Sequence, residues 1–200
     1  GNSFQIKKVC EALKTSERPL ICAGGGVISA KACGELRELA EKTRIPVVST
    51  MMGLGIFPSE HPLYMGMLGM HGVKTANEAV SKCDTMILIG ARVGDRAVRS
   101  PKFLAKTTKI IHIDVDPAEI GKNIPAHIPL VGDCKHILKE LTEKLGSAER
   151  ADWLAELSEV KNAVPEEDET EGYVNPKMFI RKLSACLLYT SPSPRDVEES

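Results

Sequence analysis

Three consecutive glycines, Gly24-Gly25-Gly26, are the first residues whose types and spacing could serve ligand chemistry. They follow a short apolar run and precede an amphipathic stretch, so we expect a strand-to-helix turn, where backbone N–H groups approach a phosphate. The spacing Gly24-x-Gly26-x-x-Ser29 lacks the third glycine of the dinucleotide fingerprint, and no acidic residue ends the next apolar run. A nicotinamide dinucleotide is therefore disfavoured, and a purely structural tight turn is the alternative.

The segment Gly66-Met-Leu-Gly-Met-His-Gly72 is more specific, because it places three glycines within seven residues. This spacing disfavours a helix and lets the backbone lie flat against a ligand. Its methionines and leucine offer apolar contact, and His71 offers one ring nitrogen, although such a histidine is more often structural than catalytic. A helix beginning near Val73 would bring its N-terminus beside the loop, which suits an anionic group.

Two arginines follow a later apolar run, in Gly90-Ala-Arg-Val-Gly-Asp-Arg96. We expect Arg92 and Arg96 at the carboxyl end of a parallel strand, where open α/β sheets bind ligands. Arginine suits bidentate contact with phosphate and stacking on a flat ring. The alternative is a solvated loop in which the arginines pair with Asp95.

Carboxylates follow the last two apolar runs. Asp114 and Asp116 end the run that begins at residue 109, and Asp133 follows the run at 128–131. A carboxylate at this position can accept hydrogen bonds from a ribose diol. Asp116 precedes Pro117 and is therefore more typical of a helix N-cap than of a ligand contact. No third ligand lies near either position, so a metal site is not expected.

Short apolar runs and amphipathic stretches alternate along the first 145 residues. The runs lack polar–apolar alternation, which is typical of parallel strands covered on both faces, and they lie at 19–23, 46–50, 85–89, 109–114 and 128–131. Helical patterns occupy residues 5–13, 30–43 (with Ser29 as N-cap), 73–81 and 134–145. Five or six strands joined by helices predict an α/β fold with a doubly wound parallel sheet.

The pattern changes after residue 145, and we divide the chain there. Residues 1–146 form the expected nucleotide-binding domain, and 147–174 hold a helix with the only tryptophan, Trp153, and an acidic linker. Asn175-Pro176 then looks like a cap and first-turn proline, so 175–185 would begin a further, truncated domain. Residues 186–200 resemble a translated sequencing adapter and are expected to be a non-native tail; a natural Ser/Pro-rich tail is the alternative.

Composition narrows the functional classes. Lys and Arg number 26 against 27 Asp and Glu, a net charge of −1 that lacks the basic footprint of a nucleic-acid binder. No apolar run is long enough to span a membrane, and no signal-peptide pattern begins the chain. The six cysteines are dispersed without a C-x-x-C pair, which favours a reducing cytoplasm over a disulfide framework or zinc site.

In this order, the four glycine-rich and charged segments resemble the central domain of the thiamine-diphosphate enzymes, most closely the acetolactate synthase (acetohydroxyacid synthase) large-subunit family. The resemblance covers roughly residues 1–183. It implies a Rossmann-like, six-stranded parallel sheet that binds FAD in an extended conformation, as a structural flavin. One departure is Arg92-Val-Gly-Asp-Arg96, where the family often shows Arg-Phe-Asp-Asp-Arg.

The resemblance also implies the residues that bind this FAD. They are Gly24, Gly25 and Gly26 along the dinucleotide; Thr50 and Met51 at the flavin end; Leu68, Gly69, Met70 and His71 along the cofactor; Gly90, Ala91, Arg92, Asp95 and Arg96 around the phosphates and ribityl chain; and Asp114, Val115 and Asp133 around the adenosine.

As a member of this family, the full-length enzyme would decarboxylate pyruvate on thiamine diphosphate and transfer the two-carbon unit to a second 2-oxo acid, in branched-chain amino-acid synthesis. The family implies that the catalytic residues and the ligands of thiamine diphosphate and Mg²⁺ lie outside this segment, so the segment alone is expected to be inactive. It also implies a homo-oligomer (dimer or tetramer) and a regulatory small subunit, with no nucleic acid and no membrane.

Other functions stay open at this point. A sister thiamine-diphosphate enzyme, such as a pyruvate oxidase-like protein, is one alternative. An oxalyl-CoA decarboxylase-like enzyme, or a non-catalytic nucleotide-binding module, would hold ADP rather than FAD in this domain. A nicotinamide dehydrogenase comes last, because the fingerprint acid is missing.

Overall fold

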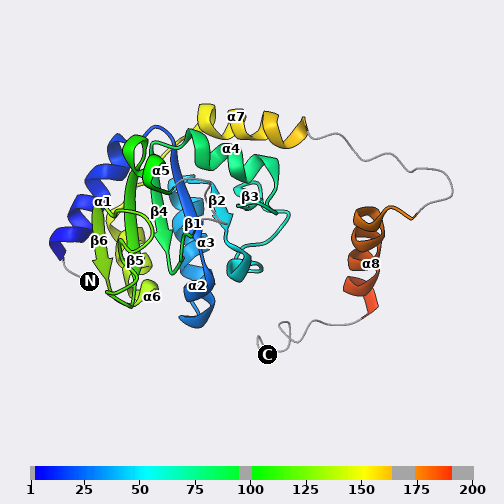
Figure 1. The fold of residues 1–200 in the computed structure, drawn as a ribbon, viewed down its shortest axis with the longest axis horizontal. Coiled ribbons are helices and arrows are strands. Elements are labelled where there is room, and N and C mark those ends of the chain that lie inside the picture. Colours follow the sequence, from blue (N-terminus) through cyan, green and yellow to red (C-terminus); the bar gives the residue numbers. More distant parts are fainter. Residues whose placement is uncertain (1–2, 95–100, 164–173, 191–200) are drawn as a thin grey trace. The chain divides into compact units, whose positions relative to one another are not determined.

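The computed structural model describes residues 3–94, 101–163 and 174–190, and the chain divides into two units, residues 1–164 and 165–200. The first unit is built on a sheet of six parallel strands in the order β3-β2-β1-β4-β5-β6 (Figure 1). This confirms the predicted α/β, doubly wound fold. The strands are β1 (Pro19–Ala23), β2 (Val47–Ser49), β3 (Tyr64–Met67), β4 (Thr85–Ile89), β5 (Lys109–Asp114) and β6 (Ile128–Val131).

The central strands are mostly apolar because helices cover both faces of the sheet. One row of aligned residues crosses five strands and contains only valine and isoleucine: Val47, Ile21, Ile87, Ile111 and Ile128. Four of these side chains are fully buried and the fifth is 9% exposed. Burying one such side chain contributes roughly 1.5–3 kcal/mol, so this row anchors the register of the sheet.

The helices form two layers. One face of the sheet packs against α1 (Ser3–Thr15), α2 (Gly25–Ser29), α3 (Cys33–Thr43) and α6 (Cys134–Lys144). The other packs against α4 (Lys74–Lys82), α5 (Pro101–Thr107) and α7 (Ala151–Asn162). Trp153 of α7 is 3% exposed and donates its indole N–H to the Pro19 carbonyl at 3.0 Å, so α7 belongs to the packed first unit.

The helix expected over 30–43 is wrong at its start. Ser29 ends α2 instead of capping the next helix, and its hydroxyl donates to the Gly25 carbonyl at 3.2 Å. Lys31 then takes a left-handed conformation (φ 51°), and α3 begins at Cys33. The chain therefore turns between two helices at a lysine, where no glycine or proline marks the break.

Besides α2 and the 3-10 helix at 51–53, two further elements were not predicted from the sequence, β3 and α5. β3 forms the edge of the sheet, and Gly66 within it has φ +97°, next to a register shift against β2. α5 comes between β4 and β5. The helix start expected at Asp116 is wrong: residues 117–120 form a turn, in which the Asp116 carboxylate accepts from the Ala118 N–H at 2.9 Å.

The described part of the second unit is α8 (Pro176–Thr190). Asn175 caps it as expected, because its side-chain oxygen accepts from the Met178 N–H at 3.3 Å. Among the described residues, no helix has both the length and the apolar character needed to cross a membrane. The predicted acidic linker falls almost entirely on residues 164–173, outside the described residues.

Candidate functional site

A cleft of about 1060 Å³ runs along the carboxyl ends of five adjacent strands, β3, β2, β1, β4 and β5. Strands lie about 4.8 Å apart, so the cleft spans roughly 19 Å of the sheet edge. Open parallel sheets bind ligands at this edge, where the strand order reverses. The lining residues are Gly25, Gly26, Ile28, Ser29, Thr50, Met51, Met52, Met67, Leu68, Met70, His71, Gly90, Arg92, Gly94, Asp114, Val115, Asp116 and Glu119.

The three glycines after β1 serve packing more than ligand approach. The Gly24 N–H donates to the Ile89 carbonyl at 2.9 Å, and the Gly26 N–H donates to the Gly90 carbonyl at 3.0 Å. A Cβ on Gly26 would lie 2.7 Å from the Gly90 Cα. Two of the three N–H groups expected to face a phosphate are therefore committed to the neighbouring strand end.

The β2 and β3 end of the cleft is apolar. Met51 and Met52 belong to the short 3-10 helix η1 (Met51–Gly53), and Met70 lies in the loop after β3. These three side chains are 64, 76 and 72% exposed. Exposed apolar side chains gathered around a cleft are typical of a surface that meets a ligand or partner.

The glycine-rich loop after β3 is held by α4. Asn77 accepts from the Gly69 N–H at 2.9 Å and donates to the Gly69 carbonyl at 3.0 Å. Gly69 has φ +107°, a conformation that favours glycine. The sequence reading missed Asn77, although an asparagine one turn into the following helix is well placed to clamp such a loop.

The β4 and β5 end of the cleft is charged. Arg92 lines the cleft just after β4, and its Nε forms an ion pair with Glu119 Oε2 at 3.1 Å. Asp114 lies at the end of β5 and accepts from the Asp116 N–H at 3.0 Å. Along its length the cleft therefore changes from methionine side chains, through an arginine, to carboxylates.

A buried histidine lies behind the carboxylate end. His112 of β5 is 3% exposed, and its Nδ1 accepts from the Gly121 N–H at 3.3 Å. Burial lowers the pKa of His112, while the negative charges of Asp114 and Glu119 oppose that shift. Its Nε2 has no hydrogen-bond partner among the described residues. The neutral imidazole supports the turn that carries Glu119.

The structure brings most of the predicted site residues together. The cleft is lined by Gly25, Gly26, Thr50, Met51, Leu68, Met70, His71, Gly90, Arg92, Asp114 and Val115. Gly24, Gly69, Ala91 and Asp133 do not line it, and Asp95 and Arg96 lie outside the described residues. Asp133 instead caps α6, accepting from the His136 N–H at 3.1 Å, a hydrogen bond that lowers the pKa of its carboxyl.

Several lining residues are absent from the predicted set: Ile28, Ser29, Met52, Met67, Gly94, Asp116 and Glu119. Met52, Met67 and Gly94 adjoin predicted residues, so extending each strand-end segment by one residue would have found them. Glu119 follows the end of β5 by five residues, and its place in the cleft depends on the turn between them.

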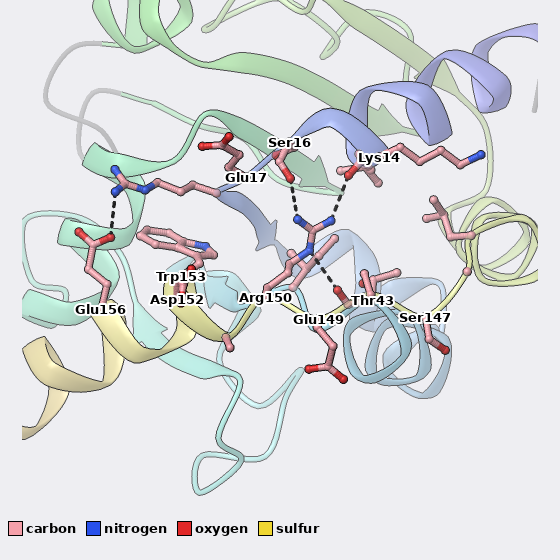
Figure 2. Close-up of a pocket in the computed structure, with 17 residues that line it drawn as sticks. Lys14, Ser16, Glu17, Thr43, Ser147, Glu149, Arg150, Asp152, Trp153 and Glu156 are labelled. Atoms are coloured by element: carbon pink, nitrogen blue, oxygen red, sulfur yellow. Dashed lines mark hydrogen bonds and ion pairs between the residues drawn. The ribbon is translucent and has the colours of Figure 1, made fainter.

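A second cleft, of about 960 Å³, lies near the amino ends of β1 and β2 (Figure 2). Its centre is Arg150, whose guanidinium donates to the carbonyls of Leu13, Ser16 and Thr43 at 3.0, 2.7 and 3.1 Å. These carbonyls lie at or just after the C-terminal ends of α1 and α3, so Arg150 acts as a shared helix cap. Among the described residues, no three His, Cys, Asp or Glu side chains form a group that could hold a metal ion.

The strand order and the position of the first cleft define an α/β domain of the kind that takes ligands at strand carboxyl ends. Residues 6–141 match the family described as "Thiamine pyrophosphate enzyme, central domain", and the chain belongs to this family. The family-level resemblance found in the sequence is thereby confirmed.

Curated relatives extend the match. The "Probable acetolactate synthase large subunit" of Methanocaldococcus jannaschii is 47% identical over 191 residues, covering 94% of this chain and 32% of that protein. The "Acetolactate synthase large subunit" of Buchnera aphidicola subsp. Schlechtendalia chinensis is 50% identical over 141 residues, 70% of this chain and 25% of that protein. The "Acetolactate synthase" of Mycobacterium avium is 40% identical over 190 residues, which cover 91% of this chain and 31% of that protein. The chain thus spans between a quarter and a third of these relatives.

Proposed function

We propose that this chain is the central part of an acetolactate synthase large subunit and that its cleft binds FAD in an extended conformation. The names of the similar proteins support the enzyme class. The observation that carries the flavin proposal is the order of side chains along the cleft, apolar at β2 and β3, cationic at β4, and acidic at β5.

That order fits the parts of an extended flavin dinucleotide. Met51 and Met70 offer an apolar surface for the flat isoalloxazine ring. Arg92 would meet the diphosphate, and the Asp114 carboxylate would accept hydrogen bonds from ribose hydroxyls. The volume of about 1060 Å³ is large enough for a dinucleotide, since drug-sized ligands occupy roughly 300–1,000 Å³.

NAD is less well supported by the same cleft. Nicotinamide dinucleotide folds hold the adenine ribose with an acidic residue at the end of the second strand. Here β2 is followed by Thr50, Met51 and Met52, and the carboxylates lie at β5. An adenosine on the carboxylates therefore leaves the ring end of the ligand on methionines, which suits a flavin.

In the full-length enzyme, thiamine diphosphate, when bound, would supply the carbanion stabilisation for pyruvate decarboxylation and two-carbon transfer to a second 2-oxo acid. We propose that its ligands, those of Mg²⁺ and the catalytic residues belong to the rest of the protein. This chain would contribute binding and orientation of a structural FAD, and alone would be inactive. A homo-oligomer, a regulatory small subunit and a cytoplasmic, branched-chain amino-acid biosynthetic role belong to the same proposal.

A flavin titration of the 200-residue chain tests the cofactor. We expect stoichiometric quenching of FAD fluorescence that ADP reverses at higher concentration and NAD does not. Arg92→Ala should weaken FAD binding about tenfold, through loss of a charge-assisted phosphate contact. Arg18→Ala, an arginine in the second cleft, is the control and should leave binding unchanged. ADP binding without any preference for FAD would instead favour the ADP-holding relatives.

A chimaera tests whether this segment can serve as the central domain of an acetolactate synthase large subunit. Residues 3–163 would replace the equivalent segment of the Methanocaldococcus jannaschii relative, and acetolactate formation from pyruvate would be measured. Activity within about tenfold of the parent is expected if the segment supplies the same FAD-binding domain. A folded chimaera that forms no acetolactate would count against this segment being the central domain of an acetolactate synthase large subunit.

A further inference from the structure

Glu119 lines the charged end of the cleft, yet its side chain is only 10% exposed. Both carboxylate oxygens are paired: Oε2 lies 3.1 Å from Arg92 Nε in an ion pair, and Oε1 accepts a hydrogen bond from Lys122 Nζ at 2.9 Å. The two cations are largely exposed, Arg92 at 75% and Lys122 at 58%. A nine-tenths buried anion thus pairs with two solvent-facing cations, of which Arg92 lines the cleft.

The turn that carries Glu119 is fixed by backbone hydrogen bonds at both ends. At its start, the Asp116 N–H donates to the Asp114 carboxylate at 3.0 Å, and the Glu119 N–H donates to the Asp116 carbonyl at 3.1 Å. At its end, the Gly121 N–H donates to His112 at 3.3 Å. The Glu119 carboxylate therefore projects from a rigid support.

Arg92 is fixed at its backbone but not at its head group. Its neighbours Ala91 and Val93 are each 1% exposed and pack in the core beneath α4 and α5. The ion pair with Glu119 is recorded at the Nε of the guanidinium, and neither terminal amino group makes a recorded hydrogen bond to a described residue. A guanidinium held by Nε presents those amino groups as a planar fork that matches phosphate oxygens.

We propose that Glu119 is a positioning residue, which holds Arg92 so that its two terminal amino groups meet the diphosphate of a nucleotide in the cleft. The proposal deepens the proposed FAD function and rests on it. Glu119 itself touches no ligand in this scheme. It converts a long, exposed side chain into an oriented phosphate contact, so that less conformational entropy is lost on binding.

Simple electrostatics predicts the opposite effect of Glu119 on binding. Glu119→Gln removes a negative charge beside Arg92 and Lys122, which by Coulomb attraction alone should strengthen the binding of a diphosphate. If Glu119 positions Arg92, the same substitution frees the guanidinium and weakens binding. The direction of the change therefore separates the two roles.

The test measures the affinities of the 200-residue chain for FAD, ADP and riboflavin. For Glu119→Gln we expect about tenfold weaker binding of FAD and ADP, and unchanged binding of riboflavin, which carries no phosphate. Glu119→Asp keeps the charge but is one methylene shorter, and should also lose most of the affinity. Lys122→Met, the matched control, leaves the Glu119–Arg92 pair intact and should change binding by no more than about threefold.

Unchanged or tighter ADP binding by Glu119→Gln overturns the proposal, as does wild-type affinity in Glu119→Asp. An equal loss for riboflavin also overturns it, because the substitution would then have damaged the cleft as a whole. If the wild-type chain binds ADP but not FAD, the flavin function fails while ADP still tests Glu119. If it binds neither, both proposals fail.

Discussion

Arg150 offers a sharp test of how the first unit is held together, because one side chain caps two helices (Figure 2). Arg150→Met keeps the length and the apolar stem of the side chain and removes every donor. It leaves the carbonyls of Leu13, Ser16 and Thr43 without their guanidinium partner. We therefore expect a large loss of stability from a residue at the edge of an open cleft.

The magnitude follows from the number of bonds and from their surroundings. Hydrogen bonds to a charged group contribute roughly 1.5–3 kcal/mol each, so three give an upper bound of roughly 9 kcal/mol. Two effects reduce this figure. Water in the cleft can reach the abandoned carbonyls, and burial, which lowers the pKa of Arg150, already opposes the guanidinium in the folded state. We expect a net loss of about 3 kcal/mol.

Urea unfolding followed by the fluorescence of Trp153, the single tryptophan, measures this loss. With a slope of about 2 kcal/mol/M, the midpoint should fall by about 1.5 M. Arg18→Met is the matched control: Arg18 pairs with Glu156 at 3.2 Å and is 48% exposed, so its loss should stay under about 1 kcal/mol. Equal, small shifts for both variants would refute the capping role of Arg150.

Three further predictions concern backbone packing, pH and thiol reactivity. Gly26→Ala forces a Cβ to within 2.7 Å of the backbone after β4 and should lower the free energy of unfolding by about 2 kcal/mol or more. Gly34→Ala, which has open space around its Cβ in α3, should instead raise it by about 0.5–1 kcal/mol. Thermal unfolding measures both, and equal effects would contradict the packing argument. Because burial lowers the pKa of His112 below its ordinary 6.5, folding favours the neutral ring. The contribution of His112 to stability is therefore fully present above pH 6.5 and is lost as the pH drops below it. His112→Gln should flatten that part of the pH–stability curve, and an unchanged curve would contradict the assignment. Burial raises the pKa of Cys22 to about 12, so this thiol should react slowly in the folded protein. A thiol reagent at pH 8 should label the exposed Cys186 within minutes and Cys22 only after unfolding. Early labelling of Cys22 would show that the core opens.

The parts of the fold that could be predicted are those with a single dominant physical cause. Strands buried on both faces must be largely apolar, so β1, β4 and β5 were visible as short runs dominated by Ile, Leu and Met. β3 was not predicted, because it lies at the edge of the sheet, is only half-buried and contains Gly66. The break between α2 and α3 was not predicted, because it depends on a left-handed conformation of Lys31. A lysine does not adopt this conformation by its own preference, so the surrounding structure imposes it.

For the site, the predictable part was its edge and not its full lining. Strand-end position alone pointed to Arg92 and Asp114, while Thr50 and Leu68 came from the family resemblance; all four line the same cleft, because residues directly after parallel strands share one edge of the sheet. Glu119 and Asn77 contribute through a turn and a helix whose paths depend on three-dimensional packing. Knowing where the strands end does not locate such residues, since their positions depend on several hydrogen bonds at once.

The glycine turn changes where a bound anion would find its partners. In a dinucleotide fold of the usual kind, N–H groups at a glycine-rich turn and the helix that follows supply much of the phosphate binding. Here the N–H groups of Gly24 and Gly26 bind the end of β4 and the residue after it, and α2 is only five residues long. A diphosphate in this cleft would therefore depend more on side chains, and Arg92 is the arginine that lines the cleft among the described residues. An exposed arginine is a poor substitute for a rigid backbone unless something fixes it, and the buried carboxylate of Glu119 provides that constraint.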